Sequence, residues 1–280
     1  MKTQKLIPTL VLIITITASL CLAENIKLNF TYPRTYQLHA QTKQTITSKL
    51  DNKTHSAAET TTFNAEFSIN PEPDSENAWI TYTLKRVRFS RSGMLGSFSY
   101  DSYLSSSLPP DSLKPYTLII NAPIKIKLSP KAKLLAVNAA PTLEKAFKTH
   151  SAAAEQIKKP IKDTVKSLID IFNLAYPPNP VSSSSPWTAN YPLPGSNERI
   201  RLKCSLKPNQ SNSHIITARS NQQNAPTTAL IKINRITGII ENLNLTTKLK
   251  TQMKIPNSQN PDPLPVNLEI TTTARFSPQN

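Results

Sequence analysis

The fold of this chain is decided by two stretches, TYQLHAQTKQTITSKL at residues 35–50 and AWITYTLKRVRFS at residues 78–90. Apolar and polar side chains alternate along much of both, which is typical of antiparallel strands with one buried and one solvated face. Both stretches are far longer than the usual five or six residues of a strand. The sequence therefore predicts a sheet that is built from unusually long antiparallel strands.

Further alternating runs surround these two stretches. In the N-terminal half they lie at 26–32, 63–69 and 124–128. In the C-terminal part they lie at 198–206, 214–220, 227–234, 239–255 and 266–276. Period-two alternation bounded by turn residues predicts a strand in each run.

The middle of the chain has a different pattern, because Ala, Lys, Glu and Leu dominate from Thr142 to Tyr176. An apolar stripe recurs there at steps of three and four residues, as on one face of a helix. Its members are Ile157, Ile161, Val165, Leu168 and Phe172. Pro160 either starts a second helix or kinks the first. We therefore expect helices over 142–158 and 160–175 that pack on the sheet.

These patterns predict an α+β protein, in which a large, curved antiparallel sheet carries a central helical segment (about 142–175) on one face. The changes in composition divide the chain into a signal peptide at 1–23, an N-terminal β segment at 24–138, a helical segment at 139–176, a Pro- and Ser-rich connector at 177–195 and a C-terminal β segment at 196–280. We expect the connector to lack regular structure, and the last segment to form one domain with residues 24–176.

The first 23 residues have the layout of a secretory signal. Lys2 and Lys5 precede an apolar run at 6–22, and Cys21 and Ala23 are small residues at the −3 and −1 positions of a cleavage site. We expect cleavage after Ala23 and an exported protein that is periplasmic, envelope-associated or secreted. Two alternatives are a retained N-terminal anchor and a lipidated Cys21. No later segment approaches membrane-spanning length without charges, so we expect no transmembrane segment after signal removal.

Composition excludes several classes of site. Only 4 of the 280 residues are glycine, whereas P-loop and Rossmann nucleotide sites need glycine-rich loops. The four histidines and two cysteines show no metal-ligand spacing. Cys204 lies on the apolar face of a predicted strand, where we expect it to be a buried hydrophobe. We therefore expect no catalytic residues, no metal, no cofactor and no enzymatic activity.

The formal net charge of +16 favours contact with anionic partners. Seven basic residues at alternating strand positions are candidates for contact with an anionic surface: Arg86, Arg88, Lys125, Lys127, Arg199, Arg201 and Lys203. The other interpretation of these side chains is a solvated outer face of the sheet. Arg86 and Arg88 share the alternation phase of Tyr82 and Leu84, so the strand must bulge or leave the core near Lys85. We expect no specific nucleic-acid recognition, because aromatic residues do not interleave with these cations.

Four short stretches resemble an uncharacterised family of secreted, β-rich bacterial proteins, a domain of unknown function. They are Pro33-Arg34-Thr35-Tyr36, Tyr100-Asp101-Ser102, the run from Ile124 to Val137 through Leu128-Ser129-Pro130, and Ile236-Thr237-Gly238-Ile239. The resemblance implies a β-rich exported protein and brings no known reaction. A looser analogy at the level of the fold is to periplasmic lipoprotein carriers, in which a curved sheet wraps helices around an apolar cavity.

These observations predict a non-enzymatic protein of the cell envelope that binds an apolar or anionic envelope ligand, such as a lipid. We expect the ligand between the helix and the sheet, with a lining of Ile161, Val165, Leu168, Phe172, Phe67, Ile80 and Tyr82. Two alternatives stay open: a structural or adhesive surface protein that binds anionic envelope polymers through its basic sheet face, and a hydrolase whose site only the fold assembles. The sequence sets no oligomeric state.

Overall fold

The computed structural model describes residues 23–50, 53–93, 96–104, 108–139, 151–193, 198–208, 212–220, 222–253 and 264–279. The strands before the main helix are β1 (Arg34–Leu50), β2 (Lys53–Pro71), β3 (Ala78–Ser92), β4 (Phe98–Asp101), β5 (Pro123–Leu128) and β6 (Leu134–Ala139). Those after it are β7 (Trp187–Pro192), β8 (Arg199–Lys207), β9 (Ser213–Ser220), β10 (Thr227–Asn234), β11 (Ile240–Met253) and β12 (Leu264–Pro278). The described helices are α1 (Lys114–Thr117) and α3 (Ser151–Ala175).

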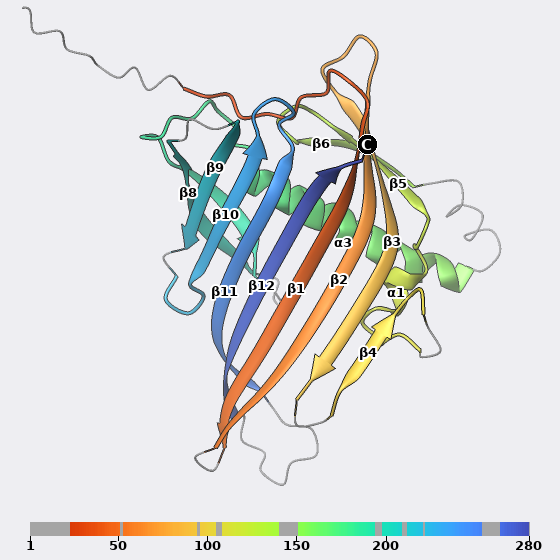
Figure 1. The fold of residues 1–280 in the computed structure, drawn as a ribbon, viewed down its shortest axis with the longest axis vertical. Coiled ribbons are helices and arrows are strands. Elements are labelled where there is room, and N and C mark those ends of the chain that lie inside the picture. The colour runs from red at the N-terminus through yellow and green to blue at the C-terminus, as the bar shows by residue number, and fades with distance from the viewer. Residues whose placement is uncertain are drawn as a thin grey trace, which may run out of the picture.

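All the described strands belong to one antiparallel sheet, in the order β6-β5-β3-β2-β1-β12-β11-β10-β9-β8-β7, with β4 on the far part of β3. The pairing of β1 with β12 runs from Tyr36 opposite Pro278 to Ser48 opposite Val266. This pair joins two meanders, one that runs outward from β1 to β6 and one that runs back from β12 to β7. Figure 1 shows the resulting twisted sheet, with α3 crossing behind it.

The expectation of an α+β class is wrong, because the described structure is mostly β. One large antiparallel sheet contains twelve described strands, whereas the described helices have 4 and 25 residues. The packing of the helical segment is a minor part of this architecture. The helical pattern over 142–175 led us to expect a larger share of helix than the structure has. Strands supply most of the buried apolar residues.

Helix α3 is continuous from Ser151 to Ala175 and contains Pro160, so the expected break into two helices at that proline is wrong. Residues 140–150, where part of the first expected helix falls, lie outside the described residues. The C-terminal half of α3 packs on the sheet through Phe172, whose ring centroid lies 6.2 Å from that of Phe67 on β2. Phe67 in turn contacts Phe276 on β12 at 5.3 Å, so the helix sits where the two meanders meet.

The structure confirms the predicted irregularity in β3. Asn64 pairs with Arg86 and Ala65 pairs with Leu84, which leaves Lys85 as the extra residue of a β-bulge. The bulge returns Val87 and Phe89 to the buried face beyond it. The connector at 177–195 is not without regular structure, because β7 forms an edge strand inside it.

The predicted strand at 26–32 is absent, although its alternation is real. The segment crosses the upper end of the sheet in Figure 1 instead of joining the sheet's hydrogen-bond ladder. Leu28 N–H donates to Pro130 O at 2.8 Å, and Asn29 N–H donates to Thr237 O at 3.0 Å. The buried side chains of this segment are Ile26, Leu28 and Phe30. It therefore closes one end of the core, held by the loops after β5 and β10.

We expect Gly238→Ala to lower the free energy of unfolding by about 2–4 kcal/mol in urea denaturation followed by circular dichroism. Gly238 has φ +68°, and an added Cβ would lie 1.9 Å from the carbonyl oxygen of Lys27. The control is Gly96→Ala, where φ is +95° but no atom lies within 4 Å of the added Cβ. It should lose only about 1 kcal/mol. Equal losses would show that close packing of the N-terminal segment contributes nothing.

Candidate functional site

A groove with an apolar floor runs along one flank of α3, and we call it the α3–β6 groove. Its volume is about 630 Å³. The apolar floor consists of Ile161, Val165 and Ile169 from the helix and of Leu134 and Val137 from β6. The helical residues recur every four positions, which places them on one face of α3. Leu134 and Val137 are 37 % and 46 % exposed, so the β6 side of the floor is accessible to solvent, whereas Ile161 and Val165 are 9 % and 7 % exposed.

Cations line the solvent side of the same groove. Lys158, Lys162 and Lys166 lie at four-residue steps along α3, next to the apolar floor. Lys162 and Lys166 form no ion pair with any residue that the structure describes. At the C-terminal end of the groove, the 4 % exposed Asp170 forms an ion pair with Arg199. The groove thus combines an apolar floor with a basic rim, which suits an amphiphile that has a negatively charged head.

A smaller cavity of about 130 Å³ lies on the other flank of α3. Its walls include Leu168 from the helix, Phe63 and Tyr82 from the sheet, and Tyr116 from α1. Burial is the main cause that raises the pKa of both phenols, so both are neutral at physiological pH. Ligand pockets for small molecules usually have volumes of about 300–1,000 Å³. The groove falls within that range and the cavity below it.

The structure therefore separates the seven predicted lining residues. Ile161 and Val165 line the groove, and Leu168 and Tyr82 line the small cavity. Phe172, Phe67 and Ile80 are at most 1 % exposed, and they fill the core between the helix and the sheet. The sequence reasoning missed Leu134, Val137 and Ile169. The four-residue spacing that selected Ile161 and Val165 reaches Ile169 too, and this signal was available.

The seven predicted surface cations also separate into two groups. Ion pairs hold Lys127 to Glu72 at 2.6 Å, Arg199 to Asp170 and Arg86 to Asp101. Those without an ion pair to described residues are Arg88, Lys125, Arg201 and Lys203. Alternation on a strand places a side chain on a face, but it carries no information on which carboxylates a neighbouring strand brings beside it.

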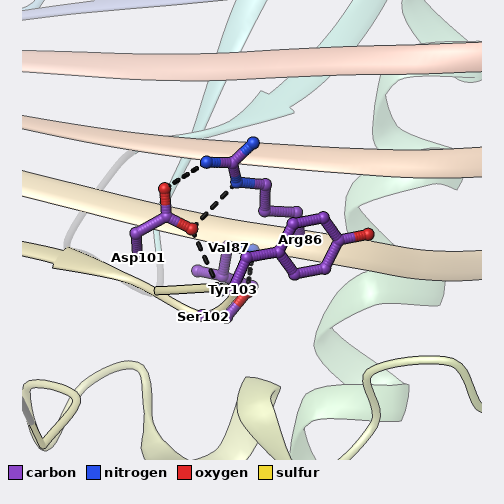
Figure 2. Close-up of polar contacts among 5 residues, drawn as sticks. All are labelled: Arg86, Val87, Asp101, Ser102 and Tyr103. Carbon is purple, nitrogen blue, oxygen red and sulfur yellow. Dashed lines mark hydrogen bonds and ion pairs between the residues drawn. The ribbon is translucent and has the colours of Figure 1, made fainter. Parts of the chain in front are cut away.

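Figure 2 shows how Arg86 is fixed at the end of β4. Its Nε donates to Asp101 Oδ1 at 2.8 Å, a second guanidinium nitrogen contacts Oδ2, and the guanidinium lies 5.0 Å from the ring centroid of Tyr103. Asp101 also accepts from the N–H of Tyr103 at 3.0 Å. Ser102 exchanges two hydrogen bonds with the backbone of Val87. This Tyr-Asp-Ser stretch therefore fastens the chain after β4 to β3, just past the bulge.

The remaining candidates for chemistry are dispersed in the structure. Burial raises the pKa of the Cys204 thiol to about 12, so it is not a nucleophile at neutral pH. His39 contacts Asn64, and His214 Nδ1 lies 2.7 Å from a carboxylate oxygen of Glu24. Within the described ranges, no three His, Cys, Asp or Glu side chains are grouped as metal ligands. Neither described helix has the length and apolar character needed to cross a membrane.

No protein-family model matches this chain, and no curated protein matches it. Among solved structures, lipovitellin, in a study of its lipid–protein interactions, matches with a TM-score of 0.49 and 10 % identity, over 88 % of this chain and 25 % of that chain. A DUF1329 family protein from Desulfovibrio piger matches with a TM-score of 0.15 and 8 % identity, over 86 % of this chain and 83 % of that chain.

This chain thus spans about a quarter of the length of the lipovitellin chain that it matches. Both TM-scores are below 0.5, and we draw no conclusion on function from them. Membership of an uncharacterised secreted family stays a prediction.

We expect the stability difference between the wild type and Asp101→Asn to shrink as pH falls. The bond from Arg86 is the main cause that lowers the pKa of Asp101 from its ordinary value of 3.8. A carboxylate with a lowered folded-state pKa stabilises the protein above its unfolded pKa, and this contribution is lost as pH falls through the folded pKa. Urea unfolding at neutral pH and at several values below 3.8 measures the difference.

The matched control is Asp111→Asn. Lys114 lowers the pKa of Asp111 in the same way, but the Asp111 side chain is 93 % exposed and its charge is screened by water. This variant should unfold like the wild type at every pH. A pH-independent difference for Asp101→Asn would mean that the charge of Asp101 contributes no stability.

Proposed function

We propose that this protein binds an amphiphilic lipid in the α3–β6 groove and carries it outside the cytoplasm without catalysing a reaction. The observation that supports this most is a groove of about 630 Å³ that combines an apolar floor, accessible on its β6 side, with lysines along its rim. An acyl chain would lie on Ile161, Val165 and Val137. A carboxylate or phosphate head would lie toward Lys162 and Lys166.

The energetics favour a chain-bearing ligand over a small polar one. Each methylene that leaves water for the floor contributes about 0.8 kcal/mol, whereas an exposed ion pair contributes at most about 1 kcal/mol. The acyl chain would therefore supply most of the affinity, and the lysines would select the sign of the head group. Such binding should weaken only slightly with added salt, because salt screens the head-group contact alone. Export would follow from the predicted signal at 1–23.

We expect Val137→Asp to weaken binding of a fluorescent fatty acid at least tenfold, an estimate of about 1.4 kcal/mol for placing a charge against the bound chain. Fluorescence titration at constant salt gives the dissociation constant. The change should not unfold the protein, since Val137 is 46 % exposed on the edge strand β6.

The control for Val137→Asp is Leu118→Asp, which introduces the same charge at a residue that is 47 % exposed and does not line the groove. It should bind like the wild type. Two results would count against the groove as the site: an equal loss in both variants, or undiminished binding by Val137→Asp. Failure of the wild type to bind any acyl chain would reject the proposed function.

We expect Lys162→Glu to weaken binding of a fatty acid about tenfold and to leave binding of an uncharged monoacylglycerol unchanged, because reversal places a negative charge beside the carboxylate head. Competition titrations with the two ligands measure this. Lys159→Glu is the control, since Lys159 is exposed on the same helix outside the groove. Equal losses for both ligands would show that Lys162 does not contact the head group.

A further inference from the structure

Carboxylates neutralise many of the cations on the strands. The ion pairs are Lys85–Glu66, Arg86–Asp101, Arg91–Glu59, Lys127–Glu72, Lys232–Glu241 and Lys248–Glu269. The net charge of +16 is therefore not spread evenly, because it remains where no acid is available. An anionic partner would therefore bind where cations have no acidic neighbour.

Three such cations lie together on β8 and β9, and we call them the β8–β9 patch. Lys203 on β8 lies directly opposite Arg219 on β9, and Arg201 is two residues from Lys203. All three are exposed, and they alternate with the buried Leu202 and Cys204 on β8 and with buried Ala218 on β9. They therefore point from the face of the sheet opposite the core. No acid among the described residues forms an ion pair with them.

The arrangement of the patch suits an anion. The three cations border one depression of about 500 Å³. Like charges directly opposite each other on neighbouring strands destabilise a sheet, and a bound anion offsets this repulsion. An acidic residue opposite Lys203 would remove this repulsion, as Glu269 on β12 does opposite Lys248 on β11. In the patch, the two cations Lys203 and Arg219 face each other instead.

An apolar side chain lies on the same face beside these cations. Leu230 on β10 is 50 % exposed, two residues along from Thr228, which pairs with Arg219. Cations flanking an exposed leucine are typical of proteins that attach reversibly to anionic bilayers, where the head groups attract the cations and the apolar side chain enters the interface. A soluble polyanion would match the cations but would give Leu230 no apolar environment.

We propose that the β8–β9 patch docks this protein on the surface of a bilayer that contains anionic phospholipids. The inference rests on the proposed function in one respect, that a carrier of an amphiphile collects or delivers it at a membrane. The two sites are adjacent in the structure, because Arg199, at the end of the α3–β6 groove, is two residues from Arg201 on β8. Two residues of a strand span about 7 Å. Docking by the patch would thus bring β8, which also borders one end of the groove through Arg199, to the surface of the bilayer.

The test is co-sedimentation of the full chain with vesicles of phosphatidylcholine alone and of phosphatidylcholine mixed with phosphatidylglycerol. The variant combines Arg201→Glu, Lys203→Glu and Arg219→Glu. The wild type should bind the mixed vesicles only, and high salt should release it. The variant should bind them about 100-fold more weakly, because each cation near an anionic surface contributes about 1 kcal/mol.

The control combines Lys43→Glu, Lys53→Glu and Lys125→Glu, three exposed lysines on β1, β2 and β5. It changes the net charge by the same amount and should keep most of the vesicle binding. An equal loss in control and variant would overturn the proposal in favour of attraction by net charge. If the wild type does not bind vesicles but binds polyphosphate through the patch, the partner is a soluble polyanion and the proposal of membrane docking is wrong.

A second set of measurements distinguishes membrane docking by the patch from lipid binding in the groove. Val137→Asp should keep the vesicle binding of the wild type, and the β8–β9 variant should keep its affinity for a fluorescent fatty acid. Loss of vesicle binding in the β8–β9 variant with intact fatty-acid binding supports docking. Vesicle binding by a protein that binds no fatty acid would reject the carrier function and leave the docking surface standing. The role of Leu230 is tested by Leu230→Ser, which should weaken binding to the mixed vesicles without changing the salt dependence of that binding.

Discussion

The pairing of β1 with β12 is the constraint on which the rest of this fold depends. It joins a strand near the start of the chain to one near its end over the length from Tyr36–Pro278 to Ser48–Val266. Two meanders then lie in one sheet, and β6 and β7 become its opposite edges. The helical segment links those two strands in the sequence, so it must cross the sheet from one edge to the other. A flat sheet of eleven strands in this order would be about 48 Å wide, and a helix of 25 residues is about 38 Å long. Twist and curvature of the sheet bring the edges within reach.

This crossing explains where the core is complete and where it is open. In the middle of the sheet, Phe172 of α3 meets Phe67 of β2, and Phe67 meets Phe276 of β12, so large side chains from three elements fill the space. Toward β6 the sheet ends, and there Leu134 and Val137 stay 37 % and 46 % exposed beside Ile161 and Val165 of the helix. The groove is therefore a consequence of the same topology that forms the core. Its floor is apolar because the helix keeps one continuous apolar stripe along both regions.

The long strands and the helix could be predicted from the sequence, since both have clear periods over many residues. The bulge at Lys85 could be predicted as well, because Arg86 breaks the phase set by Leu84. The edge strands could not. In β6 the sequence LLAVNA has consecutive apolar residues that hide the period of two, and β7 lies in a Pro- and Ser-rich stretch that is typical of a connector. The segment at 26–32 shows the opposite error, because it was predicted as a strand and is not one. Its side chains alternate between core and solvent, but its backbone bonds to Pro130 and Thr237 rather than to a neighbouring strand.

The candidate site shows why a periodic stripe predicts burial better than it predicts binding. Val165 and Phe172 belong to the same stripe of α3 and are 7 % and 1 % exposed, yet one lines an open groove and the other fills the core. What distinguishes them is the partner on the facing strand, and the partner depends on registers set by residues far away in the sequence.

The same holds for charged side chains. Lys127 and Lys203 both alternate with buried residues on their strands, but the fold brings Glu72 to Lys127 and Arg219 to Lys203. A strand's sequence therefore predicts the face that a residue occupies, while the neighbouring strand decides whether that residue is a structural contact or a site for a ligand.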